Sequence, residues 1–429
     1  MASIRNYSNA IGGSIFEYFM IRAFHCILVL ILLLPLSAEA QMDNRVLGEV
    51  SQSVNLPFSI YNGFIVVEVL MDDILPVHFI FDTGAEQTLV LKPALIPILD
   101  LKIGRRVKLI GADLSREMFG LTVRKFDLQL AGTLRVNTDL IVLEEPYLNL
   151  DEIAGVPIEG ILGANIWKNY VVKIDYNRQR ITLYNPDNFS GVPEGYIQQK
   201  ADFVRNKPYL EVDAQFQAGI TVPLKLLLDT GAAVPIVLYT NQESKITLPP
   251  NTIKGRLGTG LGGFLEGFMG RVHELKFEGF QFQALIASFQ DLDSLKLQMV
   301  DSSRNGILGN LLLKKFTIVI DYVQQKVYMQ PNNKFNAPIE FDRSGLVLIA
   351  AGANLDRKMV LDIVDGSPAD LAGIKPGDFI TKFQAMPATL YSLGKMTTIL
   401  CGKKGKTIRV RLSRDGKSKR KSFTLRDLI

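Results

Sequence analysis

Hydrophobic and polar residues alternate along much of the chain between residues 56 and 331, and this alternation predicts short β-strands. FIVVEVL (64–70), VHFIFD (77–82) and VVKIDY (171–176) are rich in β-branched and aromatic residues, which favour strands. Clusters of glycine, asparagine, aspartate and proline separate such segments, as is typical of turns. The prolines of LKPALIPIL (91–99) argue against a long helix there. The pattern therefore predicts a mainly β fold.

The strand pattern occurs twice. Asp82 and Asp229 are 147 residues apart, and GILG occurs at Gly160 and again 146 residues later, at Gly306. Each GILG is followed by an apolar run that ends in Ile-Asp-Tyr. A repeat of this length indicates two copies of one folding module. The proline- and glycine-rich segment 185–195 is the predicted linker between the two copies.

After Phe335 the pattern changes to a mixed α and β one. Residues 358–384 predict a strand, a short helix at PADLAG and a second strand. Apolar residues at helical spacing in LYSLGKMTTILCG (390–402) predict a helix. Residues 406–425 predict a hairpin with an Asp-Gly turn at Asp415. A small α+β domain is therefore expected at the C-terminus.

The N-terminal segment IRAFHCILVLILLLPLSAEAQ (21–41) has the parts of a secretory signal: Arg22, an apolar run, and the small-residue site Ala38–Ala40. We expect an exported protein, periplasmic or extracellular, without a stable membrane span after cleavage. An uncleaved anchor is the alternative. Met20 directly precedes the signal, which favours translation from Met20 over Met1. The predicted parts are the leader and signal at 1–40, lobe 1 at 56–190, lobe 2 at 203–332 and the C-terminal domain at 340–429.

Charge and cysteine content narrow the function classes. The net charge of +5 over 429 residues is too mild to imply nucleic acid as a partner. Basic residues gather between Lys403 and Lys421. A solvated basic surface explains them, and attraction to anionic lipid or cell-surface polymer is the alternative. Of the two cysteines, Cys26 lies in the signal, so no internal disulfide framework is expected beside Cys401.

The candidate chemistry lies in FIFDTGAEQTLV (79–90) and LLLDTGAAVPIV (226–237), where Asp-Thr-Gly-Ala ends an apolar strand. Two buried carboxyls brought together hold one proton between them. Such a pair can take a proton from water and donate one to a carbonyl oxygen. A plain Asp-Thr-Gly turn is the alternative. The predicted catalytic pair is Asp82 and Asp229, supported by Thr83, Gly84, Ala85, Thr230, Gly231 and Ala232.

The roles of the neighbouring residues can also be predicted. A threonine hydroxyl can bond to the backbone of the partner loop and fasten the two loops together. Glycine allows close approach to the carboxyl because it has no Cβ. Ala85 and Ala232 cannot donate a hydrogen bond that would favour a charged carboxylate. We therefore expect a mildly acidic to near-neutral pH optimum.

These motifs resemble those of pepsin-like and retropepsin-like aspartic proteases, over roughly residues 56–331. The family pairs Asp-Thr/Ser-Gly with two hydrophobic residues and a glycine downstream. The resemblance implies a bilobal, double β-barrel fold, polypeptide substrates and no cofactor. Alanine after each glycine is similar to retropepsins, although here one chain holds both lobes. The downstream motif residues are Ile161, Leu162, Gly163, Ile307, Leu308 and Gly309.

The same resemblance implies glycine-rich hairpin flaps over the cleft. GTGLGGFLEG (258–267) fits this role in lobe 2, and GADLSREMFG (111–120) occupies the corresponding place in lobe 1. A flexible surface loop is the alternative for the lobe 2 segment. The predicted flap residues are Gly111, Ala112, Gly260, Gly262 and Gly263.

Residues 340–429 resemble a PDZ domain, most closely those of bacterial exported proteases, and GSPADLAGIKPGDFI (366–380) is the distinctive part. The resemblance implies a groove in which the C-terminus of a peptide adds as a strand. A purely packing role is the alternative. The predicted peptide-binding residues are Gly345, Leu346, Val347 and Leu348.

The sequence thus predicts an exported aspartic endopeptidase with a PDZ domain for peptide or substrate binding. The alternative is a catalytically inert protein that binds peptides in the protease-like cleft and the PDZ groove. No histidine, cysteine and carboxylate cluster has metal-ligand spacing. No serine has a histidine partner in a recognisable motif, which gives no support to serine hydrolysis.

Overall fold

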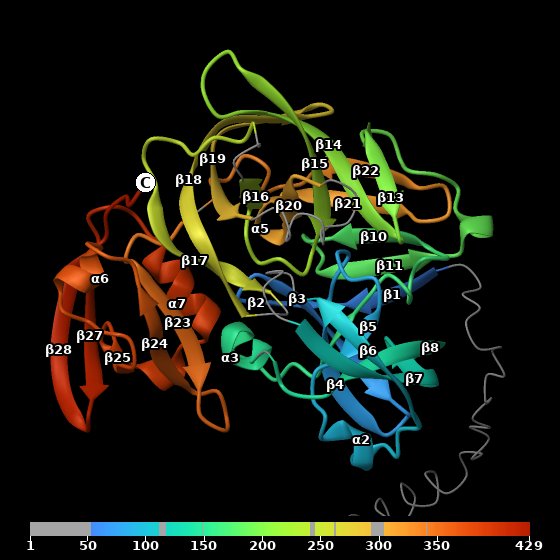
Figure 1. The fold of residues 1–429 in the computed structure, drawn as a ribbon, viewed down its shortest axis with the longest axis horizontal. Helices are drawn as coiled ribbons and strands as arrows, with labels where there is room; N and C mark the ends of the chain where they lie inside the picture. The colour runs from blue at the N-terminus through green and yellow to red at the C-terminus, as the bar shows by residue number, and fades with distance from the viewer. Residues whose placement is uncertain are drawn as a thin grey trace, which may run out of the picture. The chain divides into compact units, whose positions relative to one another are not determined.

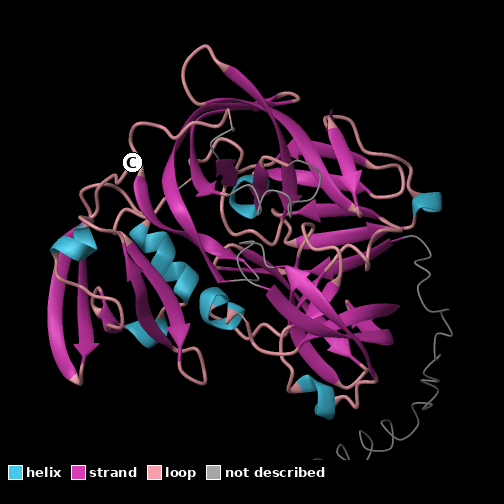
Figure 2. Cartoon of the chain, viewed as in Figure 1, coloured by secondary structure: helices cyan, strands magenta, loops and turns pink. Residues whose placement is uncertain are grey.

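The computed structural model describes residues 53–110, 117–147, 149–240, 245–260, 263–292, 304–339 and 341–429 (Figure 1). These residues all belong to one compact unit. They are mainly β, as the sequence predicts, with a few short helices (Figure 2). The predicted leader and signal lie outside the described residues. Within the described ranges, no helix is both long enough and apolar enough to cross a membrane.

Lobe 1 is built on an eight-stranded sheet. Its strand order is β2-β3-β4-β9-β5-β8-β7-β6, and β3 also pairs with β7, which curls the sheet on itself. Alternate strand residues face a core that contains Val67, Phe79 and Phe81. The elements are β2 (Ser59–Tyr61), β3 (Phe64–Met71), β4 (Leu75–Phe81), β5 (Thr88–Val90), α2 (Leu95–Ile98), β6 (Ile103–Ile110), β7 (Glu117–Leu130), β8 (Leu134–Leu143), α3 (Leu150–Ala154) and β9 (Gly160–Leu162).

Lobe 2 repeats this sheet strand for strand. Its order is β13-β14-β15-β20-β16-β19-β18-β17, and β14 also pairs with β18. The two segments that share a sequence pattern therefore fold alike. The elements are β13 (Ala201–Val204), β14 (Lys207–Gln215), β15 (Thr221–Asp229), β16 (Ile236–Thr240), β17 (Ile253–Gly260), β18 (Gly263–Phe277), β19 (Phe280–Asp291), β20 (Gly306–Gly309) and α5 (Asn310–Leu313).

A third sheet contains strands from both lobes. Its order is β1-β11-β10-β21-β22-β12, and β10 pairs with β21 across the junction. Lys173 lies opposite Val319 in this pair, and these positions differ by 146, the offset of the repeat. The approximate two-fold axis therefore passes between them. The elements are β1 (Ser53–Pro57), β10 (Val171–Asp175), β11 (Arg180–Tyr184), η1 (Pro186–Asn188), β12 (Ile197–Gln199), β21 (Phe316–Asp321) and β22 (Lys326–Pro331).

The C-terminal domain has its own sheet, in the order β23-β24-β25-β27-β28, and its own core. The predicted helix and hairpin are present: Ser392 caps α7, and Asp415 and Gly416 form the turn with φ of 50° and 73°. The elements are β23 (Leu346–Ala351), β24 (Arg357–Ile363), α6 (Pro368–Leu371), β25 (Phe379–Phe383), β26 (Met386–Pro387), η3 (Ala388–Leu390), α7 (Leu393–Leu400), β27 (Thr407–Arg414) and β28 (Lys417–Thr424).

One member of the basic C-terminal cluster has a structural role. Arg414 donates to both carboxylate oxygens of the buried Asp378, at 2.6 and 2.7 Å, and to Gly373 O at 3.0 Å. Several others, among them Lys417 and Arg420, are exposed on β28. The exposed basic residues of the cluster therefore form a solvated surface over β27, β28 and the turn before them, while Arg414 pairs with the buried Asp378.

Candidate active site

The two Asp-Thr-Gly-Ala segments begin where β4 and β15 end. Each of these strands runs parallel to the strand that carries the downstream Ile-Leu-Gly motif, β9 in lobe 1 and β20 in lobe 2. Asp82 N donates to Leu162 O at 3.2 Å. A Cβ at Gly163 would lie 2.9 Å from the backbone nitrogen of Gln87. The Ile-Leu-Gly motif therefore packs against the aspartate loop and bonds to it. Ile161 and Leu162 lie in β9, Gly163 follows it, and Ile307, Leu308 and Gly309 lie in β20.

Two threonines join the loops reciprocally. Thr83 N donates to Thr230 Oγ1, and Thr230 N donates to Thr83 Oγ1, both at 3.1 Å. Thr83 Oγ1 donates to Leu228 O at 2.7 Å, and Thr230 Oγ1 donates to Phe81 O at 2.8 Å. Both threonines have 0% exposure. All four bonds join one lobe to the other, so the threonines fix the two aspartate loops at the junction of the lobes.

The glycines leave room for the carboxyl of the opposite lobe. A Cβ at Gly84 would lie 2.7 Å from Asp229 Cγ, and a Cβ at Gly231 would overlap the Asp82 carboxyl. Each carboxyl also accepts backbone hydrogen bonds in its own loop, from Gly84 N to Asp82 at 2.7 Å and from Gly231 N to Asp229 at 2.8 Å. The structure therefore brings the two predicted aspartates together into one site.

The environment of the pair favours one shared proton. Burial, the negative charge of Asp229 and a hydrogen bond with Asp229 raise the pKa of Asp82 well above its usual range. Burial also raises the pKa of Asp229, but a hydrogen bond from Asp82 and the positive charge of Arg304 act in the opposite direction. The pair therefore favours one shared proton, and the charge of Arg304 favours Asp229 as the ionised member.

Arg304 is a site residue that the sequence analysis missed. It lies two residues before the GILG of lobe 2, and the corresponding residue in lobe 1 is Ile158. The next residue along the chain plays the same part in both lobes. Glu159 accepts a hydrogen bond from His78 N at 2.9 Å, and Asn305 accepts one from Lys225 N at 2.8 Å. The two lobes therefore match here, and a cation in one replaces a buried apolar residue in the other. Aligning the repeats at GILG would have revealed it.

The position of Arg304 accounts for its effect on Asp229. Its guanidinium carbon lies 5.5 Å from the ring centroid of Tyr239, and its side chain lines the cavity that holds both aspartates. The positive charge of Arg304 acts on the pKa of Asp229 and lowers it. It favours the charged form of Asp229 over that of Asp82.

The aspartates open into a cavity of about 1350 Å³. Both lobes line it, and so do Lys108 and Leu109 of the β6–β7 hairpin of lobe 1. Of the predicted flap residues, Gly111, Ala112 and Gly262 lie outside the described residues. Gly260 and Gly263 form the last described pair of the β17–β18 hairpin.

Residues of the C-terminal domain also line this cavity. The predicted peptide-binding residues Val347 and Leu348 line it, and so do Leu393 and Thr397 of α7. Gly345 precedes β23 with a φ of +80°. Among the residues that the structure describes, no group of three histidine, cysteine or acidic side chains could hold a metal ion.

The threonine bonds predict a measurable loss of stability. Thr230→Val leaves Phe81 O and Thr83 N buried without partners, so the free energy of unfolding should fall by about 1–3 kcal/mol. Denaturant titration of the full chain measures this change. Thr221→Val, at an exposed position of the same lobe, should change the free energy by less than about 0.5 kcal/mol. Equal effects of the two substitutions would contradict the role of Thr230.

Removal of the Arg304 charge should move the pH dependence of the activity. In Arg304→Met the pKa of Asp229 rises, so a higher pH is needed to ionise the base. The acidic limb of kcat/KM should move upward by roughly 0.5–1 pH unit. Arg304→Lys should restore part of the shift, and Arg420→Met, on exposed β28, should cause none. An acidic limb that stays in place in Arg304→Met would refute the assignment.

Comparison with known proteins points to the same chemistry. Residues 212–311 match the family model described as aspartyl protease. The match includes Asp229-Thr230-Gly231 and the second Ile-Leu-Gly motif. A search of curated proteins found no match. Residues 212–311 are therefore similar to aspartyl proteases, which supports a protease-like function for this part of the chain.

Proposed function

We propose that this protein is an exported aspartic endopeptidase, with catalytic residues Asp82 and Asp229 supplied by the two lobes of one chain. The observation that carries the proposal is the shared site: reciprocal threonine bonds hold the two loops, and each glycine makes room for the opposite carboxyl. A turn with no catalytic role would not need either feature. The aspartyl protease match to residues 212–311 supports the proposal.

The reaction would use one water molecule and no covalent intermediate. The Asp229 carboxylate takes a proton from the water while the oxygen of that water bonds to the carbon of the scissile carbonyl. At the same time Asp82 donates its proton to the carbonyl oxygen. In the second step Asp229 gives its proton to the amide nitrogen, the C–N bond breaks, and Asp82 takes a proton from one hydroxyl of the tetrahedral intermediate, whose C=O bond forms again. The products are a carboxylic acid and an amine, and the pair returns to its starting state.

Cavity size favours a polymer as the substrate. Small-molecule pockets typically occupy ~300–1,000 Å³, whereas this cavity holds about 1350 Å³. Strand edges around the cavity favour an extended chain. We propose unfolded or extended polypeptides as substrates and the PDZ-like C-terminal domain as a second binding site for them. We propose export on the basis of the signal-like residues 21–41. The protein would then be periplasmic or extracellular, and attachment to the cell surface is one form that export could take.

Hydrolysis of a denatured protein tests the proposed activity. Wild-type protein should cleave denatured casein, and a statine-type inhibitor should stop the cleavage because its hydroxyl takes the place of the attacking water. Asp82→Asn should be inactive with or without the inhibitor. If wild type and Asp82→Asn are equally inert from about pH 3 to about pH 8, a range that begins just below the ordinary carboxyl pKa values, the protein is a peptide-binding protein instead.

A further inference from the structure

The two lobes differ in character at four equivalent positions. In lobe 1 these positions are apolar and belong to one buried cluster: Phe64, Val66, Leu91 and Ile158. In lobe 2 the same positions have two cations and two phenols: Lys207, Tyr209, Tyr239 and Arg304. The repeat therefore replaces an apolar group in lobe 1 by a polar and positively charged group in lobe 2.

Strand register and hydrogen bonds establish that these positions are equivalent. Val66 pairs with Ile80, and Tyr209 pairs with Leu227, each two residues before the aspartate of its lobe. Phe64 and Lys207 stand two residues before Val66 and Tyr209, so strand alternation places each on the same face as that neighbour. Leu91 N donates to Glu159 O and Tyr239 N donates to Asn305 O, both at 2.8 Å.

Three polar atoms of the lobe 2 group are buried and have no hydrogen-bond partner among the described residues. They are Oη of Tyr209, Oη of Tyr239 and Nε of Arg304. A buried polar atom without a partner costs free energy. A bound group that accepts hydrogen bonds would therefore be stabilised here.

The lobe 2 group lies at the catalytic cavity. Lys207 and Arg304 line the cavity that holds both aspartates. The rings of the two tyrosines pack in one cluster with three apolar residues that also line it, Leu227, Val237 and Ile307. The guanidinium of Arg304 lies against one of these rings, with 5.5 Å between its carbon and the Tyr239 ring centroid. A ligand that enters the lobe 2 side of the cavity would therefore meet these cations.

Positive charge dominates the lobe 2 side of the cavity. Among the described lobe 2 residues that line it, Asp229 is the only acidic one, whereas Arg205, Lys207, Arg304 and Lys314 are cations. Arg205 lies 4.0 Å from Glu86 of lobe 1. The charge of Arg304 acts on Asp229, so it lies close to the reacting bond. A cleft with charge of one sign attracts ligands of the other sign.

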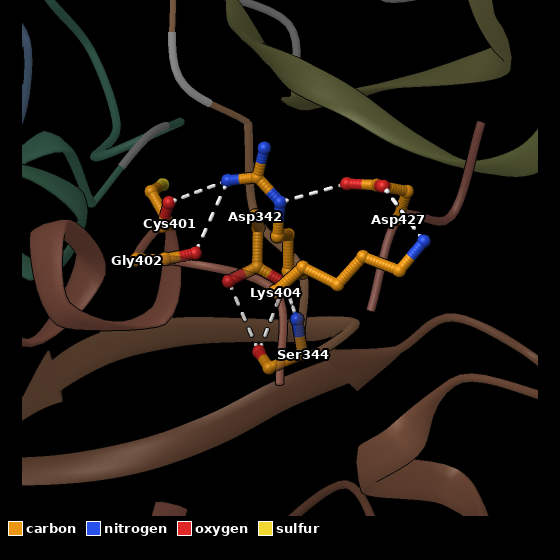
Figure 3. Close-up of polar contacts among 7 residues, drawn as sticks. Asp342, Ser344, Cys401, Gly402, Lys404 and Asp427 are labelled. Carbon is orange, nitrogen blue, oxygen red and sulfur yellow. Dashed lines mark hydrogen bonds and ion pairs between the residues drawn. The ribbon is translucent and has the colours of Figure 1, made fainter. Parts of the chain in front are cut away.

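The loop before β23 is a second place where a carboxylate could be expected, but a carboxylate of the chain itself fills it. Asp342 Oδ1 accepts from Ser344 N at 2.9 Å and from Gly345 N at 2.6 Å. Ser344 Oγ donates to both Asp342 oxygens, at 2.9 and 3.0 Å. Figure 3 shows Asp342 and Ser344 bonded to each other. An acidic group of the substrate is therefore better placed in lobe 2.

We propose that the lobe 2 side of the cleft binds an acidic side chain of the substrate beside the scissile bond, with the carboxylate held by Arg304 and Lys207. The Tyr239 hydroxyl provides a further donor. The apolar lobe 1 side receives an apolar side chain across the bond. This inference rests on the proposed proteolytic function and names the substrates of the same site, polypeptides with glutamate or aspartate next to the cut.

Peptide hydrolysis by the full-length protein tests the pocket. The probes are internally quenched fluorogenic peptides based on a casein segment that the protein cleaves, with each residue near the cut bond replaced in turn by Glu, Gln or Lys. At one position kcat/KM for Glu should exceed that for Gln at least about tenfold, and Lys should give the lowest value. Glu and Gln values that agree within about twofold at every position would overturn the proposal.

Variants of the pocket identify the residues responsible. Arg304→Met should bring the Glu and Gln values within about twofold of each other, whereas Arg420→Met, on exposed β28, should keep the wild-type preference. Both peptides meet the same catalytic pair, so their ratio does not depend on the pKa of Asp229. Tyr239→Phe and Lys207→Met should each remove part of the preference. An unchanged preference in Arg304→Met would overturn the proposal.

Binding separates failure of the pocket from failure of the protease. Fluorescence anisotropy with the full-length Asp82→Asn protein measures affinity without hydrolysis, for casein peptides that carry Glu or Gln at the same position. Tighter binding of the Glu form, lost when Arg304→Met is added, would support the pocket even if wild type does not cleave casein. Casein hydrolysis together with equal affinities and equal rates for the two forms would refute the pocket alone.

Discussion

Asp229→Asn is expected to lower kcat/KM for polypeptide hydrolysis by roughly 10²–10⁴-fold, because an amide cannot take the proton from water. The melting temperature at neutral pH should stay the same or rise. Burial raises the pKa of both carboxyls, so the folded state disfavours their charges, and that cost grows as the pH rises through the raised pKa values. Removal of one ionisable group removes this cost. Initial rates and thermal melts across the pH range measure both effects.

Asp82→Asn should cause a loss of the same size, because the carbonyl oxygen then lacks its proton donor. Asp213→Asn provides the matched control, since Asp213 is an exposed aspartate of lobe 2, and its activity should equal that of wild type. If either dyad variant keeps more than about a tenth of the wild-type activity, the two aspartates do not act as general base and acid.

Gly231→Ala is expected to lower kcat/KM at least about 100-fold, because misplacement of a reacting group by about 1 Å can have that effect. The new methyl group would overlap the carboxyl of Asp82, which must move away from Asp229. The loop is held by the threonine bonds and cannot easily yield. Steady-state kinetics, with circular dichroism to verify folding, measures the loss.

Gly255→Ala is the control for this prediction. Gly255 lies in β17 of the same lobe, and a Cβ there would meet only Val364 Cγ2, at 3.9 Å. This variant should retain wild-type activity. A folded Gly231→Ala protein with nearly normal activity would show that the two carboxyls are not packed as closely as the site requires.

The lobes and the aspartate pair could be predicted because their signals are local and occur twice. Asp82 and Asp229 each end an apolar strand, and each has an Ile-Leu-Gly motif at nearly the same distance downstream, 79 and 78 residues away. The spacing implies that the two segments fold alike, and two like segments in one chain can place like loops face to face. The C-terminal hairpin was equally predictable, since Asp-Gly between two strand patterns favours one turn type.

The sheet shared by both lobes could not be predicted in this way. β10 and β21 each have the pattern of a buried strand, but that pattern does not say which strand will lie beside them. The pairing depends on contacts between residues about 146 positions apart. The predicted linker likewise gave no sign that β12, just beyond it, would pair with β22.

Two residues that matter for the candidate site escaped the sequence analysis for a different reason. Arg304 breaks the symmetry of the repeat at a single position, and a search for similarity between the copies overlooks such a difference. Asp342 precedes a loop whose pattern suggests a carboxylate site, but only the direction of its side chain shows that it fills that loop. Side-chain direction depends on packing, which a sequence pattern does not state.

The central claim is that the two lobes of one chain form a single site in which two carboxyls share a proton. The number of inhibitor molecules bound per chain tests this claim. Isothermal titration of the full-length protein with a statine-type inhibitor should show one inhibitor bound per chain. Neither Asp82→Asn nor Asp229→Asn should bind it, because the inhibitor hydroxyl needs both carboxyls. One inhibitor per two chains, or binding that survives the loss of either aspartate, would contradict the account.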